Sequence, residues 1–244
     1  MSVYIIKNGP NGLNAKNNSI FKKFPSIIKT RGDNIDPISL AKTLSLYRYD
    51  CFGKNNNYKN ILYSLNDKDY LLTGLVNVNN TIASGDLFIQ NHASPSDNRY
   101  FIYNLCKYNK VEKKHTKSPV KLLVDKFKEI VIKDMGNPAL YLTVDMKAPL
   151  SALILTKLYI TEYDFRLDKY KDAYSIMEFK EGNENKKLGK REKQIIKLYN
   201  KFNTNMEKRE KHLNYKSSGS EKEEHFNGVY KDLFFKIITG GVTL

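Results

Sequence analysis

The stretch that decides the fold reads YFIYNLCK (100–107), PVKLLVDKFKEIVIK (119–133), ALYLTV (139–144), PLSALILTKLYI (149–160) and YSIMEF (174–179). Apolar residues recur at helical spacing in 119–133, and Pro119 stands at the first helical position, which proline favours. The segments 100–107, 139–144 and 174–179 are rich in the residues that strands prefer. Strands joined through helices of this length pair in parallel by right-handed connections, so the sequence predicts an α/β sheet.

The residues before this stretch predict an antiparallel part of the same sheet. Asp36 and Pro37 form a helix start, and the apolar spacing after them predicts a helix over 37–48. We expect strands at 60–66 and 70–78, joined as a hairpin through the turn at Asp67, and a short edge strand at 86–90. The predicted sheet is therefore mixed and partly antiparallel, with flanking helices.

The two ends of the chain differ in composition from its middle. Residues 1–36 are rich in Asn, Gly and Lys and predict an irregular segment. Beyond Lys180 the chain is mostly polar with a helical apolar period, apart from a linker-like stretch at 217–224. We therefore predict an α/β domain over 1–180 and a basic helical C-terminal extension over 181–244.

Charge is unevenly distributed along the 244 residues. The chain has 41 Lys+Arg against 26 Asp+Glu, a net charge of +15, and the excess lies in 1–60, 107–133 and 181–231. Such segments attract phosphates and predict weak, nonspecific binding of nucleic acid. Only six basic residues are Arg, and Lys, Asn, Ile and Tyr are the residues of AT-rich codons, so a solvated surface is the alternative interpretation.

Several protein classes are excluded by composition. No window approaches 18 consecutive apolar residues, which predicts no membrane-spanning helix, and the start lacks the apolar run of a signal peptide. Cys51 and Cys106 are isolated and predict neither a disulfide framework nor a zinc site. Cys106 reads as a small buried hydrophobe rather than a nucleophile. We expect a reducing intracellular compartment, the cytoplasm.

Between residues 60 and 179 the order of elements resembles the GNAT acetyltransferase superfamily. The hairpin LYSLNDKDYLLTGLVNV (62–78), with Gly74, resembles the family's second and third strands, and YFIYNLC (100–106) resembles its fourth. KKHTKSPVKLL (113–123) stands where the family has its acyl-CoA loop, with Lys117 and Pro119 at the two small positions. LYLTVDM (140–146) resembles the fifth strand, and the closing helix pattern is matched at Leu158, Tyr159 and Phe165.

The resemblance implies an N-acyltransferase that moves an acetyl group from acetyl-CoA to an amine. It implies that Tyr159 protonates the departing thiolate as a general acid. Backbone groups of Leu105, Cys106 and Lys107 would bind the pantetheine arm between the fourth and fifth strands. The phosphates would face the basic loop, whose lysines are Lys113, Lys114, Lys117 and Lys121. No metal ligand set is expected.

Two further hypotheses come from other classes of protein. A chain with this fold and altered phosphate loop could serve as a non-enzymatic component of a virus particle or another large assembly. A second copy of the chain or another partner in the assembly would then bind residues 181–244, and the protein would be located in the virion. The third hypothesis is a basic nucleic-acid-associated protein acting through its charged end segments.

Overall fold

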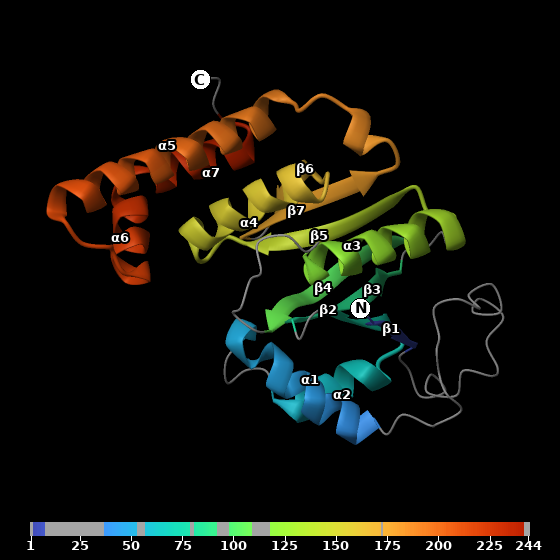
Figure 1. Cartoon of the computed structure of the whole chain (residues 1–244). Helices are drawn as coiled ribbons and strands as arrows, with labels where there is room; N and C mark the ends of the chain where they lie inside the picture. Colours follow the sequence, from blue (N-terminus) through green and yellow to red (C-terminus); the bar gives the residue numbers. More distant parts are fainter. Residues whose placement is uncertain are drawn as a thin grey trace. The chain divides into compact units, whose positions relative to one another are not determined.

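The computed structural model describes residues 2–7, 37–52, 57–78, 81–91, 98–108, 118–171 and 173–241 (Figure 1). The described strands follow the order β1-β2-β3-β4-β5-β7-β6. The pairs β1–β2, β2–β3, β3–β4 and β6–β7 are antiparallel. The predicted α/β class, with a partly antiparallel sheet and flanking helices, is confirmed. Two compact units divide the chain, Met1–Tyr141 and Leu142–Leu244. That division does not coincide with the composition change at residue 180.

The first unit alternates strands and helices. Its elements are β1 (Ser2–Lys7), α1 (Pro37–Phe52), α2 (Tyr58–Asn66), β2 (Tyr70–Val78), β3 (Thr81–Gln90), β4 (Arg99–Tyr108), α3 (Pro119–Lys128) with a π-helical end (Glu129–Asp134), and the start of β5 (Ala139–Asp145). The helices at 37–48 and 119–133 and the strands at 70–78, 100–107 and 139–144 are thereby confirmed.

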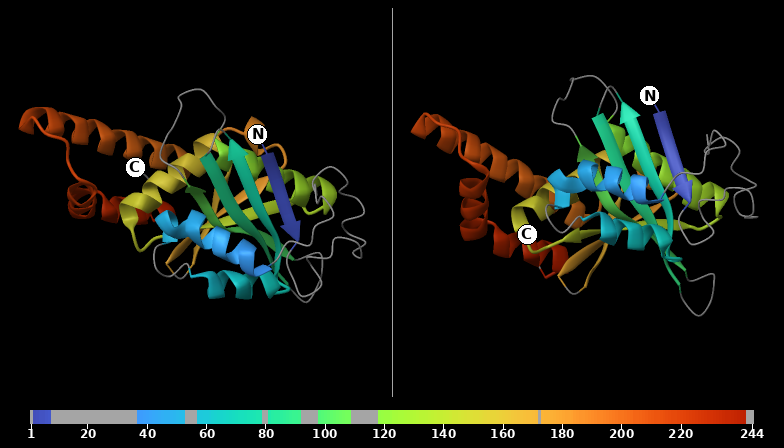
Figure 2. Two further views of the ribbon diagram at one scale, coloured as in Figure 1. Left: turned by 60° about the horizontal axis from the view of Figure 1, so that its bottom comes forward. Right: turned by 90° about the horizontal axis from the view of Figure 1, so that it is seen from below.

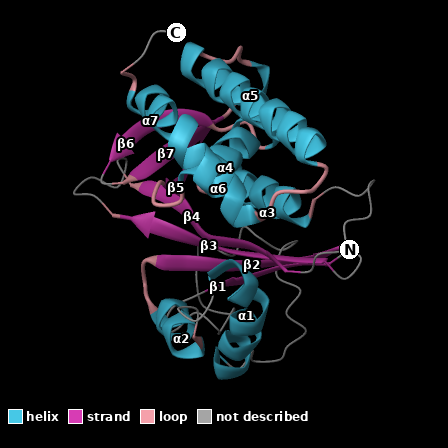
Figure 3. Cartoon of the chain, turned by 90° about the vertical axis from the view of Figure 1, so that its left-hand side faces the viewer, coloured by secondary structure: helices cyan, strands magenta, loops and turns pink. Residues whose placement is uncertain are grey.

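Helices cover both faces of β2, β3 and β4 in this unit. Helices α1 and α2 pack on one face and α3 on the other, as Figure 3 shows from the side and Figure 2 from below. On the first face Leu40, Leu44 and Ile61 form a buried cluster against the sheet. On the second face α3 buries Leu123 and Phe127, which are fully excluded from solvent.

A pair of glycines lets α3 approach the sheet closely. Gly74 of β2 and Gly85 of β3 are register partners across the β2–β3 ladder. A Cβ on Gly74 would collide with Leu123 Cδ1 and lie 3.0 Å from Phe127 Cζ. A Cβ on Gly85 would lie 3.2 Å from Leu105 Cδ1. The two residues are therefore small because a helix packs directly on their backbone.

Replacing Gly74 with alanine tests this close approach. We expect Gly74→Ala to lower the free energy of unfolding by about 1–3 kcal/mol, because the added methyl overpacks the α3 contact. The matched control is Gly228→Ala in a helix of the second unit, where a Cβ meets nothing within 4 Å. That change should raise stability by about 0.5–1 kcal/mol. Urea unfolding measures both, and a Gly74→Ala protein as stable as wild type would contradict the packing.

The predicted strand at 60–66 is wrong, because these residues form α2. Ile61 and Leu65 are spaced by four residues and both are buried, which suits a helix face. Asn57 supplies the N-cap, since its side-chain oxygen accepts a hydrogen bond from Asn60 N at 3.0 Å. The hairpin is therefore formed by β2 and β3, and the resemblance loses its match at residues 62–66 and at Gly74, which lies in the second strand.

Two other predictions about strands need correction. The short edge strand at 86–90 is the second half of β3, which has strand neighbours on both sides. Its first half contains Ser84 and Gly85, small residues that do not read as a strand but are needed where helices cover both faces. The sequence predicts an irregular segment over 1–36, but Ser2–Lys7 forms β1 and pairs with β2, and residues 8–36 lie outside the described part of the chain.

The second unit contains a hairpin and four helices among its described residues. Its elements are α4 (Pro149–Glu162), β6 (Arg166–Lys171), β7 (Tyr174–Lys180), a 3-10 turn (Asn183–Asn185), α5 (Lys190–Leu213), α6 (Gly219–Val229) and α7 (Lys231–Thr239). The expected helix at 149–160, strand at 174–179 and helical C-terminal part are confirmed. The core among the C-terminal helices is aromatic: the ring of Phe226 contacts those of Phe202, Tyr230 and Phe234, and Phe202 also contacts Tyr230.

The structure differs from the sequence-based predictions in two places within this unit. The linker-like stretch 217–224 is a helix start, because Ser218 and Glu221 form a capping box at the head of α6. Strand β6 was not expected, since its sequence RLDKYK is mostly charged. It is the last strand in the sheet order, where charged side chains are common because they discourage pairing with another chain.

Candidate functional site

The most polar place in the described core of the first unit lies between α1 and the sheet. Arg48 of α1 and Asp86 of β3 are both 2% exposed. Their side chains form a bidentate pair, with Nη1 to Oδ2 and Nη2 to Oδ1 both at 2.8 Å. Arg48 Nε also donates to Ser84 Oγ at 3.0 Å. This cluster, the Arg48–Asp86 network, joins a helix to the strand it covers.

Each carboxylate oxygen of Asp86 has a second donor. Thr73 Oγ1 of β2 donates to Oδ1 and Asn104 Nδ2 of β4 donates to Oδ2, both at 2.8 Å. Four donors on one carboxylate offset the cost of removing its charge from water. Burial raises the pKa of the Tyr70 phenol, and the negative charge of Asp86 raises it further. The charge of Asp86 therefore acts on a residue outside the network.

A bulge in β4 brings Asn104 to this network. The register between β3 and β4 shifts between Ser84 and Asp86, so one residue of β3 faces two of β4. Asn104 takes a left-handed backbone conformation with φ of 51°, which asparagine tolerates better than most residues. The bulge therefore re-aims the strand just before Leu105, Cys106 and Lys107.

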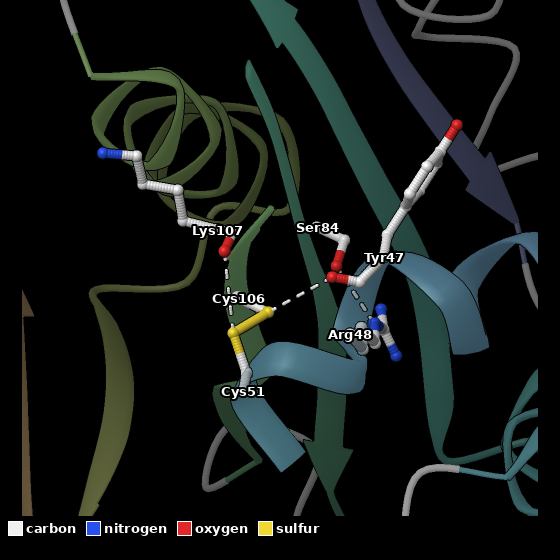
Figure 4. The surroundings of a disulfide bond; sticks show 6 residues. All are labelled: Tyr47, Arg48, Cys51, Ser84, Cys106 and Lys107. Atoms are coloured by element: carbon white, nitrogen blue, oxygen red, sulfur yellow. Dashed lines mark hydrogen bonds between the residues drawn. A yellow bond between two sulfur atoms is a disulfide. The ribbon is translucent and has the colours of Figure 1, made fainter. Parts of the chain in front are cut away.

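A disulfide joins the two cysteines of the chain, Cys51 and Cys106 (Figure 4). The expectation of separate cysteines without a disulfide is therefore wrong, and the argument for a reducing compartment loses its premise. Cys51 is exposed at the last turn of α1, while Cys106 is buried in β4. Sequence reasoning missed the pair because a separation of 55 positions carries no spacing signal. The cysteines meet only once α1 crosses the sheet.

The surroundings of the disulfide include backbone carbonyls. Cys51 Sγ lies 3.8 Å from Lys107 O, and Cys106 Sγ lies 3.7 Å from Tyr47 O (Figure 4). After reduction each thiol would have one of these carbonyls as an acceptor, so α1 and β4 would keep a weak polar contact. The disulfide and the Arg48–Asp86 network both attach the second half of α1 to the sheet.

Reduction of the disulfide should measurably destabilise the chain. Closing a loop of this length is worth about 4 kcal/mol in the chain-entropy model, and natural disulfides contribute about 2–4 kcal/mol. We expect dithiothreitol to lower the free energy of unfolding of the wild type by that amount. The Cys51→Ser variant should be equally destabilised and insensitive to dithiothreitol. Two titratable thiols in the unreduced, denatured wild type would contradict the pairing.

The predicted cofactor-binding residues divide between described and undescribed parts of the chain. Leu105, Cys106 and Lys107 lie together in β4, where Cys106 pairs in register with Ser84 and Lys107 with Ala83. Lys121 lies in the first turns of α3, and its ammonium is 3.5 Å from Asp125 of the same helix. Lys113, Lys114 and Lys117 lie outside the described residues. Cys106 is buried as expected, but the disulfide leaves it no free thiol.

Tyr159, the predicted general acid, lies on the buried face of α4 in the second unit. It is 8% exposed, and its ring lies 5.8 Å from that of Tyr163 and 6.4 Å from that of Phe165. Burial raises the pKa of the Tyr159 phenol, and Tyr163 raises it further. The phenol is therefore protonated at neutral pH, and its raised pKa makes it a weaker acid than an exposed tyrosine.

Among the described residues no three His, Cys, Asp or Glu side chains gather as a metal site. None of the described helices is both long and apolar enough to cross a bilayer. Comparison with models of protein families and with curated proteins gives no match.

Proposed function

We propose that this chain is a GNAT-like N-acyltransferase that moves an acetyl group from acetyl-CoA to an amine. The observation that carries the proposal is the order of three features along the chain, which are β4, the bulge in β4 and α3. A bulged strand leads through a basic segment to a helix whose N-cap, Ser118, makes no side-chain capping hydrogen bond. The resemblance assigns the strand to the pantetheine arm of CoA, and the basic segment with the start of the helix to its phosphates.

The pantetheine arm would bind backbone groups of Leu105, Cys106 and Lys107. These residues follow the bulge at Asn104, and a bulge disrupts the regular ladder and bends its strand. The disulfide fixes the position of Cys106, and with it this part of the strand, against α1. Binding through backbone groups needs a rigid strand rather than particular side chains, which fits the apolar side chain of Leu105 and the buried one of Cys106.

The phosphates would face the start of α3. Ser118 is the N-cap and makes no capping hydrogen bond through its side chain, so the helix N-terminus is not closed by its own cap. Pro119 occupies the first helical position, where the missing N–H would have had no helical partner in any case. The lysines of 113–121 would supply positive charge in place of the glycines that the family uses there.

The chemistry requires the amine nitrogen to attack the thioester carbonyl carbon. The new C–N bond forms, the C–S bond breaks, and the amine gives up a proton as the amide forms. In the role that the resemblance assigns to it, Tyr159 would donate its phenolic proton to the departing thiolate, and the proton released by the amine would restore the phenol. Most of the rate enhancement in such a reaction comes from positioning the two reactants.

Acetyl-CoA binding is tested by thermal unfolding, with ATP as the control for nonspecific phosphate binding. At about 100 times its Kd, acetyl-CoA should add about 2.7 kcal/mol of stability, which raises Tm by a few degrees. ATP at the same concentration should have a smaller effect. An equal effect of ATP, or no shift at millimolar acetyl-CoA, would contradict the proposal and favour a non-enzymatic component of an assembly.

The Tyr159→Phe variant separates binding from catalysis in the same experiment. Phenylalanine keeps the ring packing against Tyr163 and Phe165, so acetyl-CoA should stabilise the variant as much as the wild type. With an amine found by an acceptor screen, kcat should fall by about 10²–10⁴, the usual contribution of a general acid. An unchanged kcat would show that Tyr159 is not the proton donor.

A further inference from the structure

Helix α5 carries six exposed lysines along one side. They are Lys190, Lys193, Lys197, Lys201, Lys208 and Lys211, and we call them the lysine ridge. Successive members are three, four or seven residues apart, so they share one face of the helix. At 1.5 Å per residue the ridge is about 32 Å long. The neighbouring Asn200 and Thr204 are exposed and polar as well.

The opposite side of α5 is fixed to the body of the second unit. Ile195, Leu198, Phe202 and Met206 are buried there. Helix α5 packs against α4 and α7. The ridge is therefore presented by a rigid helix and faces away from the core.

The carboxylates of α5 do not neutralise the ridge. Glu192 is buried and accepts a hydrogen bond from Leu167 N at 3.1 Å. Glu210 forms an ion pair with Lys222 of α6 at 3.1 Å. Glu207 is exposed, yet no carboxylate in the described part of the chain lies within ion-pair distance of a ridge lysine. The positive charge of the ridge is therefore available to a partner.

We propose that the lysine ridge binds the phosphate backbone of a nucleic acid duplex. A straight line of like charges about 32 Å long matches one turn of B-form DNA, which is about 34 Å. Lysine ammonium groups contact phosphates as point charges, whereas base edges are most often read by the arginine fork. The ridge has no arginine, so we expect binding without sequence preference. This surface is independent of the proposed acyltransferase site.

A membrane surface fits the ridge less well than a duplex does. A helix that lies on a bilayer inserts an apolar face among the lipids. The apolar face of α5 is occupied by the core of its own unit, and the exposed Asn200 and Thr204 beside the ridge are polar. The ridge would therefore meet a membrane by charge alone.

The test compares two charge-matched triple variants of the full chain. Lys193→Gln, Lys197→Gln and Lys201→Gln remove half of the ridge, and glutamine keeps the helix propensity of lysine. The control replaces Lys59, Lys68 and Lys147, which are exposed elsewhere, with glutamine. Binding to DNA duplexes of about 20 base pairs and two unrelated sequences is followed by fluorescence anisotropy over a range of salt concentrations.

The expected result is a change in the salt dependence of the ridge variant. The slope of log K against log salt is negative, and each lost phosphate contact reduces its magnitude by about 0.9, so the slope of the ridge variant should be shallower than that of the wild type by about 2.7. The control variant should keep the wild-type slope, and the two DNA sequences should bind alike. Equal losses in both variants, no binding of wild type at about 50 mM salt, or tighter binding to anionic lipid vesicles than to the duplex would each overturn the proposal.

Discussion

Arg48 and Asp86 bring opposite charges together at a place that water does not reach, and the layer of α1 over the sheet depends on their meeting. The pair recruits a donor from each of β2 and β4, through Thr73 and Asn104. Three strands and one helix are therefore fixed by one carboxylate. If either Arg48 or Asp86 lost its partner, the other would be a buried, unpaired charge, which costs several kcal/mol of stability. The disulfide then holds the last turn of the same helix on β4.

The sequence predicted the elements whose apolar spacing is set by burial on one side. The segments 119–133 and 139–144 are examples, since a helix period and a continuous apolar strand are both visible without tertiary information. Prediction from the sequence failed where the identity of a residue depends on a contact with a residue far away in the chain. Gly85 and Ser84 look like a loop until helices cover both faces of β3, and the Arg48–Asp86 network and the disulfide join residues 38 and 55 positions apart. Leu105, Cys106 and Lys107 could be located in a strand, but the bulge before them could not be seen in the sequence.

The two proposals depend on different chemical groups of the chain. The acyltransferase proposal uses backbone groups that a rigid strand presents, and the features that stiffen β4 are the network at Asn104 and the disulfide at Cys106. The lysine ridge uses side-chain charge that a rigid helix presents, and its support is the aromatic core beneath α5. The net charge of the chain does not distinguish these roles from a solvated surface. The alignment of exposed lysines along one side of α5 favours a binding role.

A double-mutant cycle on Arg48 and Asp86 tests the central claim most directly. Arg48→Met and Asp86→Leu each remove one charge and keep most of the side-chain volume. Each single variant should lose about 3–5 kcal/mol of unfolding free energy, because it leaves the other charge buried and unpaired. The double variant should lose clearly less than the sum, with a coupling of about 2 kcal/mol or more. Additive losses of less than about 1 kcal/mol each would mean that α1 is held on the sheet by other contacts.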